Sequence, residues 1–287
     1  MPTISVIIPT HNRAWVLKEA IDSVLAQDFH DFEIVVVDDG STDNTPKILE
    51  SYEQIRTVKQ GHRGVSAARN AGIARAMGNL ITFLDSDDLW LPGKLSAQAD
   101  FFNTHPDAMI CQTEEIWIKN GIRVNPKKRH KKHSGMIFEH CLELCIISPS
   151  AVMMRRCLFD EVGGFDETMP VCEDYDFWLR VACRFPVYLI ENSLVIKRGG
   201  HPDQLSRRGC MDRYRVHALK KVIESDLLDP KQYSAAVRAL RKKCLIYAAG
   251  CLKRGRRREA KHYTWLSSRS ELRGFAPIGL PWRWVRR

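Results

Sequence analysis

Three carboxylates stand together at the end of a short apolar run. Asp85, Asp87 and Asp88 follow residues 80–84, which are apolar except for one threonine. Acids gathered at the carboxyl end of a strand repel one another unless a cation neutralises them. Mg²⁺ and Mn²⁺ take oxygen ligands and commonly share them between one or two carboxylates and a substrate phosphate. Asp85 and Asp87 therefore predict a metal-bound diphosphate. The alternative is that these acids only cap the helix expected after Pro92.

A second acidic pair, Glu173 and Asp174, stands at the start of an apolar helical stretch. Carboxylates are favourable at the positive end of a helix for ordinary capping reasons. A carboxylate held on a rigid helix start can also take a proton from a hydroxyl group. The pair is therefore a candidate general base as well as a helix cap.

The segments that must position these acids alternate between strands and helices. Strands are predicted at 4–8, 34–37, 57–59 and 80–84, with helices between them at 17–25, 48–52 and 65–76. This alternation with short connections predicts an α/β fold, a doubly wound and mostly parallel sheet with flanking helices.

Polar residues follow three of these strands and should converge, because parallel strands end at one edge of the sheet. They are Pro9-Thr10, Asp38-Asp39 and Asp85-Ser86-Asp87. The first strand is not followed by GxGxxG, and the chain has no GKS or GKT phosphate loop, which weakens both common nucleotide-binding interpretations. In the expected site, one loop offers an acid to a nucleotide base or ribose. Another loop offers a metal to a diphosphate.

The composition favours a cytosolic α/β protein. With 287 residues and 44% hydrophobic content, the chain can bury one large core. It has no apolar run of about 18 residues and no basic-then-apolar N-terminal pattern, so we expect neither a membrane span nor secretion. The nine cysteines include no CxxC pair. We interpret them as reduced core residues.

The formal net charge of +10 is concentrated in residues 127–133 and in the last third of the chain. Such asymmetry predicts an anionic partner surface. The run 127–133 is either a solvated loop or a contact for a phosphorylated or lipid-linked acceptor. The arginine cluster 254–258 and the terminal Trp282 and Trp284 combine cations with tryptophan, which suits a membrane interface and would also suit RNA.

Four sequence fragments together resemble the inverting family 2 glycosyltransferases, which have the GT-A fold. They are SVIIPTHNR at 5–13, VVDDGSTD at 36–43, GVSAARNAG at 64–72 and LDSDD at 84–88. Each fragment is weak alone, but their order and spacing are highly specific. The resemblance covers residues 4 to about 206. It implies transfer of a sugar from a nucleoside diphosphate to an acceptor hydroxyl, with Mn²⁺ or Mg²⁺ as cofactor.

The resemblance also implies roles for individual residues. It assigns the general base to Asp174 and the metal to Asp87 and His201. It places Glu173, Gly164 and Arg198 in the acceptor or phosphate loops. It implies nucleotide contacts for the following residues: Pro9, Thr10, Asn12, Arg13, Asp38, Asp39, Arg69, Asp85 and Ser86. The alternatives are turn chemistry for the aspartates and a simple salt bridge on a helix for Arg69.

We therefore expect a glycosyltransferase domain at 1–208, with a nucleotide-binding half at about 1–90 and an acceptor half at about 91–208. A basic helical segment follows at 209–287. The expected partners are a nucleoside-diphosphate sugar, with a UDP-sugar favoured, and a glycan or lipid-linked acceptor of envelope or exopolysaccharide synthesis. We expect a cytoplasmic location, at the inner face of the plasma membrane if the basic segment binds anionic lipid, and no nucleic acid partner. The alternative is an inactive module that binds nucleic acid or membrane through the basic segment.

Overall fold

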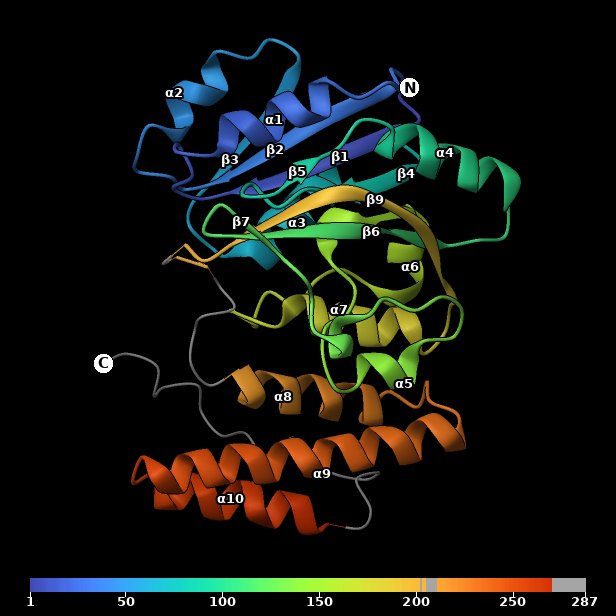
Figure 1. The fold of residues 1–287 in the computed structure, drawn as a ribbon. Helices are drawn as coiled ribbons and strands as arrows, with labels where there is room; N and C mark the ends of the chain where they lie inside the picture. The colour runs from blue at the N-terminus through green and yellow to red at the C-terminus, as the bar shows by residue number, and fades with distance from the viewer. Residues whose placement is uncertain (202, 205–210, 270–287) are drawn as a thin grey trace.

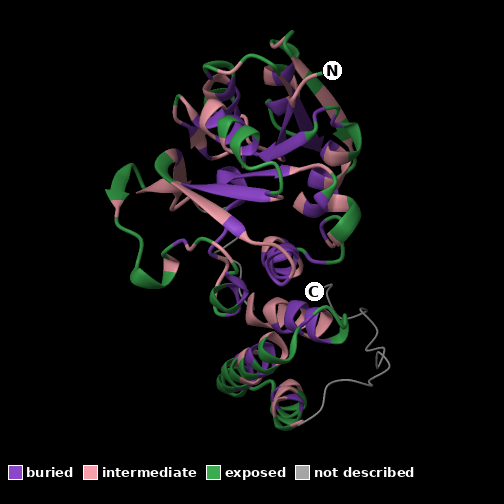
Figure 2. Ribbon diagram, turned by 90° about the vertical axis from the view of Figure 1, so that its right-hand side faces the viewer, coloured by how far each residue is buried: buried purple, intermediate pink, exposed green. Residues whose placement is uncertain are grey.

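The fold is seen in a computed structural model, which describes residues 1–201, 203–204 and 211–269. Figure 1 shows a twisted sheet in the upper half of the molecule with helices on both faces, and a layer of further helices at the bottom. Side chains alternate across the first strand, so that Ile4, Val6 and Ile8 belong to one hydrophobic cluster and Ile7 to another. The sheet is therefore buried on both faces, as Figure 2 shows by the purple strands.

The first half of the chain forms a parallel α/β unit. Its strands are β1 (Ile4–Thr10), β2 (Phe32–Asp39), β3 (Ile55–Gln60) and β4 (Leu80–Phe83), and its helices are α1 (Leu17–Leu25), α2 (Thr45–Glu50) and α3 (Val65–Arg75). The strands pair in the order β3-β2-β1-β4, all parallel. Their register places Pro9 beside Val37 and Thr10 beside Asp38. The predicted polar loops therefore leave the sheet at one edge.

The second half extends this sheet with strands of mixed direction. Its strands are β5 (Leu89–Trp90), β6 (Ile110–Lys119), β7 (Ile122–Val124), β8 (Val152–Arg155) and β9 (Val187–Gly199). Its helices are α4 (Lys94–Thr104), α5 (Phe138–Cys141), α6 (Leu158–Val162) and α7 (Glu173–Ala182). β8 runs antiparallel to both β4 and β6, whereas β6 and β9 are parallel. The result is one nine-stranded sheet, in agreement with the predicted α/β class.

The last described helices are α8 (Met211–Glu224), α9 (Pro230–Lys253) and α10 (Arg257–Ser268). α9 begins with a capping box, in which Asp229 accepts from the Gln232 amide and Gln232 returns a bond to the Asp229 backbone. Val216, Leu219 and Val222 of α8 share one hydrophobic cluster with α7. The helical segment is thus packed on the α/β body. None of the described helices is long and apolar enough to cross a membrane.

The predicted boundary near residue 208 lies outside the described residues, as do Trp282 and Trp284. The division into two domains stays a prediction. No disulfide joins the eight cysteines within the described ranges, where all but Cys145 and Cys157 are buried.

Candidate active site

Asn12 holds the β1 and β2 loops together at the carboxyl edge of the sheet. Its backbone is left-handed, with φ 52°. Its amide N–H donates to Ser41 Oγ at 2.9 Å, and its Oδ1 accepts from the Thr42 amide at 2.8 Å. Beside this junction the Oγ1 of Thr10 is buried and has no hydrogen-bond partner within the described part of the chain. Thr10 therefore has a free hydroxyl for a ligand, because a buried polar atom is rarely left unsatisfied.

Asp39 orders the neighbouring loop. Its carboxylate accepts from Gln60 Nε2 at 2.6 Å, from His62 Nδ1 at 2.8 Å, and from the amides of Arg63 and Gly64 at 2.8 Å each. These four bonds occupy the usual acceptor positions of a carboxylate. Any direct contact between this carboxylate and a nucleoside must therefore replace one of them.

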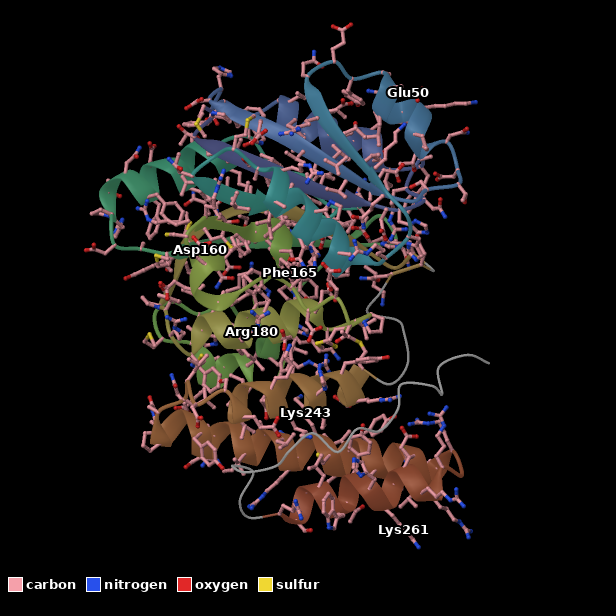
Figure 3. The ribbon with its side chains drawn as sticks, turned by 180° about the vertical axis from the view of Figure 1, so that it is seen from behind. Glu50, Asp160, Phe165, Arg180, Lys243 and Lys261 are labelled. Atoms are coloured by element: carbon pink, nitrogen blue, oxygen red, sulfur yellow. The ribbon has the colours of Figure 1, made fainter. Side chains whose placement is uncertain are left out.

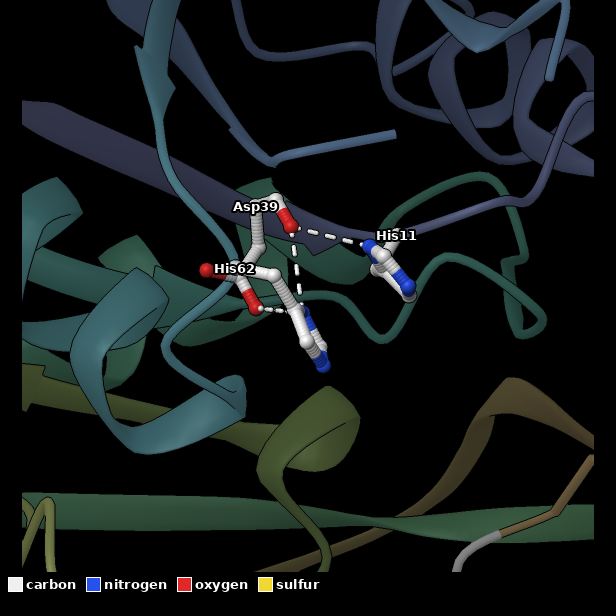
Figure 4. Close-up of side chains that lie close together, drawn as sticks. All are labelled: His11, Asp39 and His62. Atoms are coloured by element: carbon white, nitrogen blue, oxygen red, sulfur yellow. Dashed lines mark hydrogen bonds and ion pairs between the residues drawn. The ribbon is translucent and has the colours of Figure 1, made fainter. Parts of the chain in front are cut away.

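Two histidines flank Asp39 and were not assigned a role from the sequence (Figure 4). The rings of His11 and His62 stack with centroids 4.0 Å apart, and the Nδ1 of each lies within 3.2 Å of the Asp39 carbonyl oxygen. Their ligand atoms and a carboxylate oxygen of Asp39 lie within 4.8 Å of one another, a spacing that a metal ion could use. The saturated carboxylate argues against that use. The sequence signals for the pair were the positions of both histidines close after strands and the place of His11 in the fragment 5–13.

The three clustered acids have different surroundings. Asp85 Oδ1 accepts from Arg69 Nη2 at 2.7 Å, and Asp87 Oδ2 lies 2.7 Å from His201 Nε2. Asp88 is buried, where it accepts from Ser150 Oγ at 2.6 Å and from the Arg198 amide at 2.9 Å. Burial raises the pKa of Asp88 well above its usual range, and the charges of Asp87 and Asp85 add to that shift. Asp88 therefore fixes the end of β9, which leaves Asp85 and Asp87 toward the site.

Arg69 joins this acidic loop to the start of α7. Its side chain is buried between Asp85 and Glu173, with Nη1 donating to Glu173 Oε1 at 2.8 Å. Burial and the charge of Asp174 raise the pKa of Glu173 to about 7, although Arg69 opposes the shift. The structure thus brings the predicted nucleotide residue Arg69 and the predicted acid Glu173 together, in a buried salt bridge between two segments of the chain.

Asp174 has the opposite orientation from Glu173. It lines a cavity of about 380 Å³ bounded by β6, β9 and the starts of α7 and α8. Its Oδ1 accepts from the Tyr175 amide at 2.7 Å, and its Oδ2 lies 3.3 Å from the Cys145 thiol. Only one member of the Glu-Asp pair therefore faces open volume.

The remaining predicted residues have three kinds of surroundings. Arg198 lines the same cavity and reaches Glu19 with Nη1 at 2.5 Å, and Arg13 pairs with Asp203, which also contacts His201 at 2.6 Å. Pro9, Asp38 and Ser86 are buried at the strand ends. Gly164 does not line the cavity: it packs on Asn70 of α3, and its carbonyl accepts from Arg180 Nη2 at 2.8 Å. Figure 3 labels Arg180 and Phe165 at this junction.

The sequence profile described as Glycosyl transferase family 2 matches residues 5–163. An uncharacterized glycosyltransferase of Rickettsia typhi is 34% identical, covering 79% of this chain and 74% of that protein. The chain belongs to glycosyl transferase family 2. A Rickettsia felis family member is 32% identical over 72% of this chain, which spans only 36% of that protein's length.

Two solved structures share the fold of this chain. S. aureus TarS in complex with UDP-GlcNAc aligns with a TM-score of 0.69 and 22% identity, covering 85% of this chain and 72% of that one. The mannosyltransferase PcManGT from Pyrobaculum calidifontis, in complex with GDP-Man and Mn²⁺, aligns with a TM-score of 0.59 and 18% identity, covering 94% and 76%. The GT-A architecture predicted for this family 2 chain is confirmed.

Proposed function

We propose that this chain is an inverting, metal-dependent glycosyltransferase that moves a sugar from a nucleoside diphosphate to an acceptor hydroxyl. One observation carries the proposal: Asp174 opens onto a cavity, and Arg69 connects the adjacent Glu173 directly to the Asp85 loop. A base and a diphosphate site are thereby held in one rigid unit. Inversion needs this separation of roles, because the acceptor attacks from the face opposite the leaving diphosphate.

Asp87 and His201 are the residues that would hold Mn²⁺ or Mg²⁺. Their facing atoms, Oδ2 and Nε2, lie 2.7 Å apart in a direct contact that a bound metal would replace, and a carboxylate with an imidazole is a suitable donor set. Asp203 contacts the other ring nitrogen of His201 at 2.6 Å, an orienting contact typical of ligand histidines. When bound, the metal supplies positive charge to the departing diphosphate.

The protein residues complete the reaction as follows. Asp174 takes the proton of the acceptor hydroxyl with its carboxylate, which the Tyr175 amide and the Cys145 thiol hold in place. Arg198 adds a cation beside the Asp87 loop. Thr10, Asn12 and Asp38 are proposed to contact the nucleoside, and the uncommitted Thr10 hydroxyl supports this.

We favour a UDP-sugar donor, with a glycan or lipid-linked acceptor of envelope or exopolysaccharide synthesis. The TarS complex with UDP-GlcNAc supports the uridine choice, and the PcManGT complex with GDP-Man and Mn²⁺ keeps guanosine as the second candidate. Calorimetric titration with UDP-sugars and GDP-sugars, each with and without Mn²⁺, tests the proposal. Binding of one nucleotide series only when Mn²⁺ is present is expected, and no binding under any condition would overturn it.

We also propose that the helical segment contacts an anionic membrane. Leu245, Ile246 and Leu252 are exposed on α9, next to a basic cluster at 253–258.

A non-catalytic module that binds nucleic acid is the second candidate function. The intact Asp85, Asp87 and Asp174 argue against it, because an inactive fold has no need of these acids.

A further inference from the structure

The cavity next to Asp174 is lined by more cations than acids. Its acids are Glu115 and Asp174, and its cations are Lys119, Lys132, Lys197, Arg198 and Arg215. Lys132 and Glu115 neutralise each other in a buried ion pair at 2.9 Å, and Arg198 is paired with Glu19. Lys197 and Arg215 also line the volume that Asp174 opens onto, and the acid paired with Arg215, Asp212, does not line it. A cavity of this kind favours an anionic occupant.

Arg215, on α8, has one edge of its guanidinium uncommitted. Its Nη1 donates to Asp212 at 3.1 Å, whereas its Nε is buried without an acceptor among residues 1–201, 203–204 and 211–269. The Nε and Nη2 atoms form the fork that binds a carboxylate or phosphate with two parallel hydrogen bonds. A buried donor without an acceptor is costly, so an anionic ligand at this edge removes an existing penalty.

Lys197, near the end of β9, supplies the second cation. Its Nζ donates to Ser148 Oγ at 3.1 Å and lies 5.6 Å from the centre of the Trp117 ring. An ammonium has three donors, and the hydroxyl of Ser148 uses one of them. Lys197 can therefore bind an anion without losing its existing contact.

Trp117 gives the cavity an aromatic wall. Its Nε1–H donates to Glu115 Oε2 at 3.0 Å, and the ring meets His130 edge-on at 5.1 Å. The polar atom of the indole is thereby turned to Glu115, and the ring is fixed in orientation. A rigid aromatic surface suits the C–H face of a sugar ring, because the face of the indole ring is electron-rich.

We propose that this cavity binds an anionic saccharide acceptor, whose sugar ring packs on Trp117 and whose phosphate or carboxylate group is bound by Arg215 and Lys197. This inference rests on the proposed function, since it takes Asp174 as the base that receives the acceptor proton. It adds the chemical class of the acceptor, and it gives the buried Lys132–Glu115 pair the role of fixing the Trp117 wall.

Ligand-observed NMR with the full chain tests this inference. The probes are glucose, galactose and mannose, each compared with its 6-phosphate and its uronate, in saturating UDP and Mn²⁺. The nucleotide fills the donor site, so anions bound there are displaced and those in the acceptor cavity are not. We expect at least one charged probe to bind about tenfold more tightly than its parent sugar. The phosphate and uronate series identify which anion the cavity prefers.

Five variants localise the effect. Arg215→Gln should abolish the preference for charged probes and Arg215→Lys should restore part of it, whereas Lys220→Gln removes a charge from α8 outside the cavity lining and should leave the preference intact. Trp117→Ala should weaken charged and neutral sugars alike, and Trp265→Ala on α10 should not. UDP binding, measured separately by calorimetry, reports on the proposed function.

Three results would overturn the inference while UDP still binds. They are equal affinity for charged and neutral probes, displacement of the charged probe by UDP, and an equal loss in Arg215→Gln and Lys220→Gln. Absence of binding for all nine probes would count against it as well. A chain that binds no nucleotide but keeps the Arg215-dependent preference would refute the donor assignment and leave the anion site standing.

Discussion

Asp174 lines the cavity, whereas Glu173 does not. This difference predicts that a substitution of Asp174 lowers turnover without changing donor affinity. Asp174→Asn should leave the donor dissociation constant within about twofold, because the side chain faces the acceptor side. Transfer should fall by about 10²–10⁴-fold, the usual contribution of a general base. Calorimetry and a product assay on the same preparation measure the two quantities. A variant that retained most of its turnover would remove Asp174 from the mechanism.

Asp87 gives the complementary prediction. Asp87→Ala should weaken donor binding in the presence of Mn²⁺ and lower turnover as well, because the carboxylate is proposed to connect the metal to the protein. Asp88 is the matched comparison: Asp88→Asn should lower stability, since it holds Ser150 and the Arg198 amide in a buried position. Equal Mn²⁺-dependent donor affinity in the wild type and in Asp87→Ala would contradict the metal assignment.

Glu173 predicts a pH dependence of stability. Its pKa in the folded chain is about 7, above the ordinary value of 4.5, because burial and Asp174 disfavour its charged form. For an acid with a raised pKa, the unfolded state loses its proton first, so the free energy of unfolding falls as pH rises from about 4.5 to 7. Glu173→Gln should show a smaller fall between pH 5 and pH 8 in thermal unfolding. The exposed Glu53→Gln should follow the wild type, and parallel curves for Glu173→Gln and the wild type would refute the assignment.

The side-chain roles were only partly readable from the sequence. The types and spacing of Asp85 and Asp87 indicated a metal site, whereas His201 was assigned to it only by the family resemblance. The structure brings Asp87 and His201 together. The direction of Arg69 was not readable, because it depends on two carboxylates from distant segments that fold around it. The open edge of Arg215 depends likewise on the docking of α8, about which the local sequence says nothing.

At the scale of elements, we expect a substitution of Gly164 to change the stability of the fold and not the binding of an acceptor. A Cβ at this position would lie 2.7 Å from Asn70 Oδ1, which itself accepts from the Phe165 amide at 2.9 Å. Gly164→Ala should therefore lower the free energy of unfolding by about 1–3 kcal/mol, as overpacking does. Gly61→Ala is the control, because its Cβ would meet nothing within 4 Å. Chemical denaturation checks both, and an unchanged midpoint for Gly164→Ala would refute the packing argument.

The longer helices and strands of the first half agree, to within a few residues, with the bounds predicted from the periodicity of the sequence. α1 was predicted at its observed bounds, and β1, β2 and β4 differ from prediction by a few residues at their ends. The short elements β5, β7 and α5 have two, three and four residues and were not predicted. Segments this short hold less than one full repeat of a helix or strand pattern, so their structure depends on pairing with β9, β6 and α7.

In the whole molecule, the candidate active site and the proposed membrane surface lie far apart. The site lies at the carboxyl edge of the sheet, whereas α9 and α10 lie at the far end of the body (Figure 1), and Figure 3 shows Lys261 on the outer side of α10. Leu245 and Leu252 lie seven residues apart, two turns along one exposed face of α9, with Ile246 beside them. A helix face with apolar residues beside arginines can lie on an anionic bilayer while the cavity stays open to an acceptor.

The last prediction tests this membrane surface. Each Lys or Arg near an anionic leaflet contributes on the order of 1 kcal/mol, and buried leucines add to this. A variant with Leu245, Ile246 and Leu252 changed to Gln should float less with anionic vesicles, and Arg256–Arg258 changed to Gln should make the remaining binding insensitive to salt. Ile122→Gln, which removes an exposed apolar side chain from β7, should float like the wild type. Equal flotation of all variants would exclude α9 as the docking face, and so would equal flotation with neutral and anionic vesicles. Retention of RNA in place of vesicles would favour the nucleic acid module.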